Sequence, residues 1–327
     1  MNNFSYVRAD THEAARAAAG TGDNVRYLAG GTDLIPLLKD RIYSPASIVD
    51  ISGWRDSSSI SSTDTDLLIG ALTALSDLAS DETVRRDYAA LAEACNLAAS
   101  PQLRNMGSLA GNLLQQTRCW YFRGHHNCWM KGGQFCYARD GENENHAIFM
   151  THQSESKCVS AHPSDPGAAL LALDATILIL TDTGPGELPI TEFFALPSDA
   201  RRTYTNLPEG ALITGIRLPK AGPGRKSSYT KAMARASWAF ALAGIALSVD
   251  VKDAKIGQVR VAVTGVAPIP FRVTEVERQI SGSAPGDLDF DALAETLTRD
   301  AAPLTHNGYK VQLLGALFRQ ALADLLM

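Results

Sequence analysis

Four of the five cysteines in the chain lie in one polar segment, where their thiol groups are numerous enough to hold a metal centre. They are spaced as Cys119-x8-Cys128-x7-Cys136-x21-Cys158. Structural zinc sites and [4Fe–4S] clusters both take four protein ligands, and thiolate is a preferred ligand of each. The neighbouring stretches GHHN, KGGQ and DGENEN are too polar and glycine-rich to build a core, so a bound metal would supply the order that packing cannot.

The spacing alone does not choose the metal. It matches neither the C-x2-C-x2-C run of bacterial ferredoxins nor the paired C-x2-C of zinc ribbons. His125 and His126 lie between the cysteines and are further candidate zinc ligands. A [4Fe–4S] cluster, a zinc site and uncommitted thiols therefore stay open on the residues alone. The fifth cysteine, Cys95, falls in the helical apolar pattern LAEACNLAA and is expected to be an inert core thiol.

Aromatic residues are concentrated around these cysteines. Such side chains can shield a metal centre from water, which tunes its potential, or they can anchor another subunit. Both uses stay open for Trp120, Tyr121, Phe122, Trp129 and Phe135.

Two glycine-containing turns could bind phosphate. Ala29-Gly30-Gly31-Thr32-Asp33 lies between a strand-like and a helix-like segment, and glycine lets the main chain approach a ligand closely. A purely structural turn explains this motif equally well. The second turn runs from Arg104 to Asn112, and two such turns suit a diphosphate better than one does. Neither follows the G-x-G-x-x-G pattern, so a Rossmann-type NAD site is not expected.

The elements that would position these turns alternate between strand and helix over the first 175 or so residues. Thr11 is expected to cap the helix THEAARAAAG, and Ser76 to Ala99 is expected to form one or two helices. Turn formers dominate residues 181–208, which suggests a connection with a short strand or two. The last third alternates long strands with helices, which predicts an antiparallel sheet with helices on one face.

Composition narrows the classes of function. A formal net charge of −5 and the lack of a basic stripe argue against a nucleic-acid partner. No apolar run is long enough for a membrane span, and the N-terminus does not resemble a secretory signal. The compartment stays open, because a subunit without a signal can be cytoplasmic or be exported to the periplasm with a signal-bearing partner.

Several separated motifs carry a family resemblance. LAGGTDLI, LRNMGSLAGN, HPSD and VTGVAPIPFR resemble the FAD-binding subunits of molybdenum hydroxylases, the group that includes xanthine dehydrogenase and carbon monoxide dehydrogenase. The resemblance implies an α+β fold. It implies a two-lobed FAD-binding domain of the vanillyl-alcohol-oxidase (PCMH) type over residues 1–215, with an insertion at about 113–160. A carbon monoxide dehydrogenase flavoprotein C-terminal α+β domain would follow over 216–327.

The same resemblance implies an FAD site. In the family both glycine turns hold the FAD pyrophosphate, which corresponds here to Leu28, Ala29, Gly30, Gly31, Thr32, Asp33 and Leu34, and to Gly107, Ser108, Gly111 and Asn112. Asp165 would bond the ribose or adenine end of FAD; alternatively it caps a helix. Lys231 is a candidate for a contact near the flavin, and a plain surface lysine is the alternative.

The cysteine segment narrows the resemblance further. LLQxTRCxYF and C-x-x-x-HPSD are similar to the FAD subunits of bacterial aldehyde oxidoreductases of the periplasmic type, which carry a [4Fe–4S] cluster in this insertion. A comparable insertion with a cluster occurs in 4-hydroxybenzoyl-CoA reductase. The resemblance thus implies that Cys119, Cys128, Cys136 and Cys158 are the cluster ligands.

The implied role is electron transfer rather than substrate chemistry, with no catalytic residue on this chain. A large molybdenum-cofactor subunit would oxidise an aldehyde, a small subunit with two [2Fe–2S] clusters would relay electrons, and FAD would pass them to an external acceptor. Oxygen, NAD, a quinone and a redox protein all stay open as that acceptor. Alternatives are the FAD subunit of a xanthine or aromatic-CoA enzyme, and a stand-alone flavoprotein oxidase with a zinc-ordered docking loop.

Overall fold

The computed structural model describes residues 1–20, 24–54 and 56–326, and its N-terminal lobe is a small parallel sheet. The strand order is β1–β3–β2, with bounds Ser5–Arg8, Ser47–Asp50 and Val25–Leu28. Helix α1 (His12–Ala19) begins as predicted, because the Thr11 side chain accepts a hydrogen bond from the Ala14 N–H. Helix α2 (Leu34–Lys39) follows β2 after the first glycine turn.

The second lobe is a five-stranded antiparallel sheet of order β4–β5–β8–β6–β7. The bounds are Ile60–Ser62, Asp66–Gly70, Leu212–Pro219, Thr176–Thr181 and Gly184–Pro189. The stretch rich in turn formers supplies β7 and the short helix α10 (Ile190–Phe193). The domain boundary predicted at residue 215 falls inside β8, whereas the next sheet begins only with β9 at Arg225.

Three helices, rather than one or two, occupy the segment from Leu75 to Leu97. They are α3 (Leu75–Ser80), α4 (Glu82–Asp87) and α5 (Ala89–Leu97). Asp81 separates the first two by accepting from the Val84 N–H, and the non-helical backbone of Tyr88 separates the second two. Short helix α6 (Pro101–Arg104) ends where the second glycine turn begins, and α7 (Leu109–Leu113) contains the last residues of that turn.

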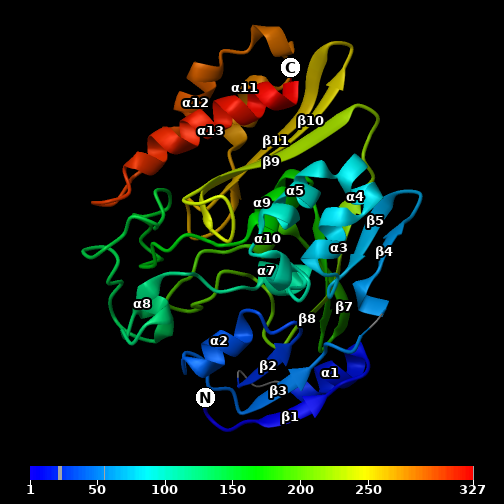
Figure 1. The fold of residues 1–327 in the computed structure, drawn as a ribbon, viewed down its shortest axis with the longest axis vertical. Helices are drawn as coiled ribbons and strands as arrows, with labels where there is room; N and C mark the ends of the chain where they lie inside the picture. Colours follow the sequence, from blue (N-terminus) through cyan, green and yellow to red (C-terminus); the bar gives the residue numbers. More distant parts are fainter. Residues whose placement is uncertain (21–23, 55, 327) are drawn as a thin grey trace.

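The C-terminal domain is the predicted antiparallel sheet, of order β12–β11–β10–β9. Its strands are Phe271–Arg272, Lys255–Thr264, Ala241–Lys252 and Arg225–Met233. Helices α11 (Thr274–Ile280), α12 (Phe290–Thr298) and α13 (Tyr309–Leu326) cover one face, as expected (Figure 1). The opposite face, which includes Tyr229 and Ala246, packs into the core of the FAD-binding lobe against α5 and α9.

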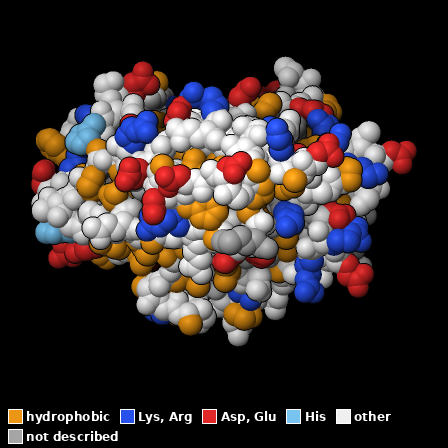
Figure 2. All heavy atoms as spheres, turned by 90° about the horizontal axis from the view of Figure 1, so that it is seen from above, with side chains coloured by type: hydrophobic (Ala, Val, Ile, Leu, Met, Phe, Trp, Pro, Cys, Tyr) orange, Lys and Arg blue, Asp and Glu red, His pale blue; other side chains and the backbone are white. Residues whose placement is uncertain are grey.

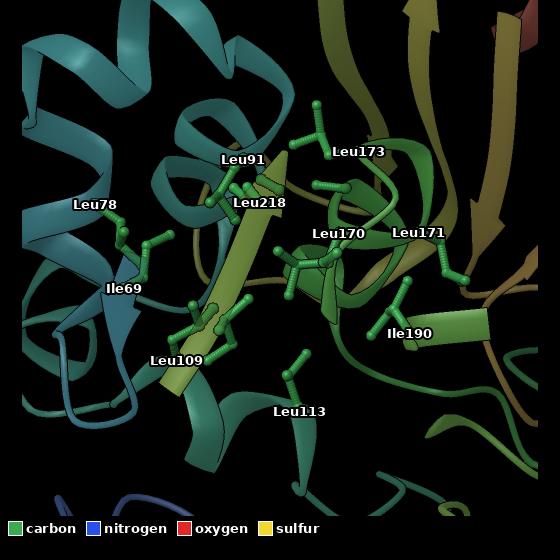
Figure 3. Close-up of a cluster of buried hydrophobic side chains, with 14 of the residues drawn as sticks. Ile69, Leu78, Leu91, Leu109, Leu113, Leu170, Leu171, Leu173, Ile190 and Leu218 are labelled. Carbon is green, nitrogen blue, oxygen red and sulfur yellow. The ribbon is translucent and has the colours of Figure 1, made fainter. Parts of the chain in front are cut away.

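Helix α9 (Asp165–Ala172) is buried along its whole length. Figure 3 shows Leu170 and Leu171 within a cluster that also contains Leu113 of α7 and Leu218 of β8. A helix that is apolar on all sides is held by packing on all sides. The start of α9, where the HPSD motif lies, is therefore fixed relative to both the FAD-binding lobe and the C-terminal sheet.

The cysteine segment 113–160 has little regular structure. Only α8 (Trp120–Arg123) and the 3-10 turn Trp129–Lys131 form within it, and Figure 1 shows it as long green loops at the left, near the beginning of α13. Figure 2 shows acidic and basic side chains intermingled on the face seen from above. Within the described residues, no helix is both long and apolar enough to cross a membrane.

Candidate FAD and thiol sites

The two glycine turns lie against each other, and glycine is what permits this approach. A Cβ atom on Gly30 would lie 1.6 Å from the main-chain oxygen of Met106, a distance that no side chain can accommodate. Gly31 has a φ of +71°, a left-handed conformation that glycine adopts without strain. In the described part of the chain, the N–H groups from Gly30 to Asp33 donate no hydrogen bond, so the first turn presents unused donors.

Between the turns lies a cavity of about 420 Å³, which is within the usual size of a cofactor site. Eleven of the thirteen residues predicted from the resemblance to bind FAD line it: Ala29, Gly30, Gly31, Thr32, Asp33, Leu34, Gly107, Ser108, Gly111, Asn112 and Asp165. Leu28 and Lys231 are not among the lining residues. Leu28 instead packs behind the first turn, where its Cδ1 would lie 3.2 Å from a Cβ on Gly31.

The carboxylate of Asp33 binds the protein itself. It accepts hydrogen bonds from Arg118 Nη1 at 2.5 Å, from Arg123 Nη2 at 2.8 Å and from the Gln116 N–H at 2.8 Å. Burial alone would raise the pKa of Asp33, but the two guanidinium groups outweigh burial and hold that pKa below its ordinary value. Asp33 thus joins the first turn to the cysteine segment and leaves its main-chain N–H for a ligand.

Side chains of the second turn fasten it to the HPSD motif. Ser108 caps α7 by accepting from the Gly111 N–H at 3.2 Å. Ser164 Oγ donates to Asn112 Oδ1 at 2.6 Å and also caps α9 by accepting from the Gly167 N–H. The cap of α9 is therefore Ser164, and the alternative that Asp165 is the cap is wrong by one position.

Asp165 lies one residue inside α9, where its carboxylate is 3% exposed and paired. It accepts from Lys231 Nζ at 2.7 Å and from the Tyr229 hydroxyl at 2.6 Å. Burial raises the pKa of Asp165, and Lys231 and Tyr229 oppose that rise. The Lys231 side chain is 1% exposed, so the alternative of a plain surface lysine is wrong. Lys231 supports Asp165 from behind, and Asp165 faces the cavity.

The four cysteines of the insertion line a second, much smaller cavity of about 20 Å³. Its walls are Thr117, Cys119, Tyr121, Phe122, Cys128, Trp129, Met130, Cys136, Tyr137, His146, Cys158 and Ser160. All four thiols are unpaired, so no disulfide joins them. No three His, Cys, Asp or Glu side chains of the described chain converge closely enough to hold a single metal ion. His125 and His126, proposed as alternative zinc ligands, are exposed and do not line this cavity.

The thiol cavity is shielded from water. Burial raises the pKa of Cys119 to about 12 and raises the pKa values of the other three thiols. A metal centre that binds such thiols displaces their protons, so the sulfurs would bind it as thiolates. Trp129 and Phe122 are buried in the wall, whereas Trp120 and Phe135 are 44% and 71% exposed. The aromatic residues therefore divide between shielding the thiols and presenting apolar surface.

A third cavity, of about 430 Å³, lies between the other two. It shares Arg118, Trp238 and Phe240 with the FAD cavity, and Cys119 and His146 with the thiol cavity. The Arg118 guanidinium stacks on the Phe240 ring with its carbon 4.9 Å from the ring centre. The third cavity thus shares wall residues with both the FAD cavity and the thiol cavity and links the two.

Several residues of this region were not predicted from the sequence to belong to the site. Arg118, Arg123 and His146 contact Asp33 or Cys119 across separations of 85, 90 and 27 residues. Trp238 and Phe240 reach the cavities from the loop between β9 and β10. The only signal was the exposed aromatic pair in SWAF, since two large rings in a polar loop often mark a binding surface.

Two family models together match almost the whole chain. Residues 2–221 match the model of the FAD binding domain in molybdopterin dehydrogenase. Residues 228–325 match the model of the CO dehydrogenase flavoprotein C-terminal domain. These matches confirm the predicted fold class.

Individual relatives agree with the family models. The aldehyde oxidoreductase FAD-binding subunit PaoB of Escherichia coli is 35% identical, over 99% of this chain and 98% of the relative. The glyceraldehyde dehydrogenase medium chain of Sulfolobus acidocaldarius is 30% identical, over 93% of this chain and 91% of that protein. A structure of carbon monoxide dehydrogenase from Hydrogenophaga pseudoflava shares the fold, with a TM-score of 0.77 at 24% identity, over 98% of this chain and 96% of that one.

A whole-length match, a shared fold and a cavity between two glycine turns therefore lead to one assignment. The chain belongs to the FAD-binding medium subunits of the xanthine dehydrogenase and carbon monoxide dehydrogenase family of molybdenum hydroxylases, a family of oxidoreductases.

Proposed function

We propose that the chain is the FAD-binding electron-transfer subunit of a heterotrimeric, molybdenum-containing aldehyde oxidase or dehydrogenase. The observation that carries this proposal is the connection of an FAD-sized cavity to four clustered thiols in one chain. Similarity to relatives that are named aldehyde oxidoreductase and glyceraldehyde dehydrogenase supports the aldehyde class.

The chain's part in binding FAD follows from the first cavity. The unused N–H groups from Gly30 to Asp33 would bind the pyrophosphate, and glycine allows it to approach the main chain. Asp165 would bond the ribose or adenine end, held in place by Lys231 and Tyr229. Bound FAD takes up electrons singly and gives them up as a pair, which suits a relay between one-electron centres and an acceptor.

The four thiols would hold a [4Fe–4S] cluster. Four cysteines around one shielded cavity are the donor set that such a cluster takes, and Cys119, Cys128, Cys136 and Cys158 supply it. His125 and His126 are exposed and do not line this cavity, so a zinc ion there would have to be held by the same four thiols. The aromatic wall would keep water from the sulfurs.

The partners would be a large molybdenum-cofactor subunit and a small subunit with two [2Fe–2S] clusters. Exposed Trp120, Trp238 and Phe240 line the third cavity and form an apolar surface suited to a protein partner near the FAD site. Electrons would pass from the small subunit to FAD and then to an external acceptor.

An absorption spectrum of the anaerobically purified chain, with flavin, iron, zinc and acid-labile sulfide measured on the same sample, tests the proposal. We expect flavin bands over a broad iron–sulfur shoulder, with about four irons per flavin. Flavin with one zinc and no iron would favour the zinc-ordered docking loop. Aldehyde turnover by the isolated chain would favour the stand-alone oxidase, whereas copurification with molybdenum-containing partners would exclude it.

A further inference from the structure

A buried polar network connects the C-terminal domain to the cysteine segment. Lys310, in the first turn of α13, has no exposed surface, and its Nζ donates to the main-chain oxygens of Asn145, His146 and Gly265 at 3.2, 3.1 and 2.9 Å. An ammonium group has three hydrogens to donate, and all three find acceptors here. These main-chain oxygens, rather than a carboxylate, are the partners of the buried Nζ, and two of them tie residues 145–146 to the start of α13.

Asn307 fastens the same stretch from the preceding loop. Its Nδ2 donates to the oxygens of His146 and Ala147 at 3.2 and 2.9 Å, and its Oδ1 accepts from the Leu304 N–H. Like Lys310, it has no exposed surface. Four hydrogen bonds from two buried side chains therefore determine where residues 145–147 lie.

The side chain of the residue held in this way reaches a thiol. His146 is 3% exposed, and its Nε2 lies 3.2 Å from the Sγ of Cys119. Within the described chain its Nδ1 has no hydrogen-bond partner. A metal-bound thiolate only accepts hydrogen bonds, so a hydrogen on Nε2 would be donated to the Cys119 sulfur at this distance.

We propose that His146 is a positioning residue for the Cys119 sulfur, and that Asn307 and Lys310 of the C-terminal domain hold it in place. The inference rests on the proposed [4Fe–4S] site. An N–H donated to a cluster thiolate stabilises the reduced, more negative state and so raises the reduction potential. The C-terminal domain would thereby set both the orientation and the potential of a centre that lies in the FAD-binding domain.

The test compares variants of the complete, FAD-containing protein, purified without oxygen. In His146→Leu the donor is lost, so we expect the midpoint potential of the iron–sulfur signal to move to a more negative value while iron per flavin stays near wild type. In His146→Gln an amide nitrogen can occupy the position of Nε2, so the potential should return toward that of wild type. His125→Leu, at an exposed histidine of the same segment, is the control and should change nothing.

Lys310→Met tests whether Lys310 holds residues 145–146 in place. It removes all three donors, so we expect faster hydrogen exchange at residues 143–147 and a shift in potential of the same sign as His146→Leu. If this variant does not fold, the two His146 variants decide the question. If wild type holds iron and His146→Leu keeps the wild-type potential, this inference is wrong and the proposed function stands. If wild type holds flavin but no iron, the proposed cluster fails and the inference fails with it.

Discussion

Gly30→Ala gives the sharpest test of the FAD site, because its effect follows from one distance. The new Cβ would lie 1.6 Å from the Met106 oxygen, and real Cβ atoms essentially never come closer than 3.0 Å to another atom. The obstacle is main chain on the second turn, so the two turns must separate by more than 1 Å. A hydrogen bond stretched by that amount from about 2.9 Å no longer meets the distance limit.

The expected loss of affinity follows from the bonds broken. A hydrogen bond to a charged group contributes about 1.5–3 kcal/mol, so loss of two to the pyrophosphate costs about 3–6 kcal/mol. At about 1.4 kcal/mol per factor of ten, the Kd for FAD should rise roughly 10²- to 10⁴-fold. At Gly31 the obstacles are flexible side chains, and a positive φ costs about 1–2 kcal/mol, so Gly31→Ala should lose only about tenfold.

The assay is titration of the flavin-free chain with FAD, followed by flavin fluorescence, for wild type and both variants. Gly222→Ala is the matched control, because nothing lies within 4 Å of a Cβ there and its φ is ordinary. Near-ultraviolet circular dichroism establishes that each variant is folded. A Kd for folded Gly30→Ala within threefold of wild type would refute the assignment of the turns to the pyrophosphate.

Three further changes probe other parts of the structure. Cys128→Ser should remove most of the iron while leaving the flavin, because the thiol and FAD cavities have separate walls; iron equal to wild type on elemental analysis would exclude Cys128 as a ligand. Lys231→Met should lower the free energy of unfolding by about 3–5 kcal/mol, because it leaves the Asp165 carboxylate buried without its cation, and Asp165→Asn should recover part of that loss in urea unfolding. Burial lowers the pKa of His162 to about 3, below the unfolded value of 6.5. The free energy of unfolding is therefore highest above pH 6.5 and falls as the pH drops from 6.5 toward 3, because the unfolded chain then binds a proton that the folded chain does not. Between pH 6.5 and 5 the free energy of unfolding of wild type should therefore fall by about 2 kcal/mol more than that of His162→Gln, and equal falls would contradict this.

Local patterns predicted much of the fold. The cap at Thr11, the strand before and the helix after the first turn, and the antiparallel C-terminal sheet each have a signal within a few residues. The helix count between Leu75 and Leu97 was wrong, because a single apolar pattern continued across the break at Tyr88. The second covered face of the C-terminal sheet was missed, because it depends on packing between domains rather than on local pattern.

The site was predictable to the same degree. Glycines and cysteines stand out by type, and the structure brings them to the walls of two cavities. The partners of Asp33, Asp165 and Cys119 lie 27 to 90 residues away, and no local spacing announces a contact of that kind. The ligand roles of these residues and the domain boundary at 215 stay predictions.

The hydrogen bonds from Asn307 and Lys310 to residues 145–147 also set an order of events during synthesis. Cys158, the last of the four thiols, leaves the ribosome well before Lys310. Domains fold as they emerge, N-terminal first, but this loop cannot take its final form until the last helix is made. We therefore expect the proposed cluster to be assembled only after α13 has been made, and a truncated chain that lacks α13 to take up less iron than the full chain.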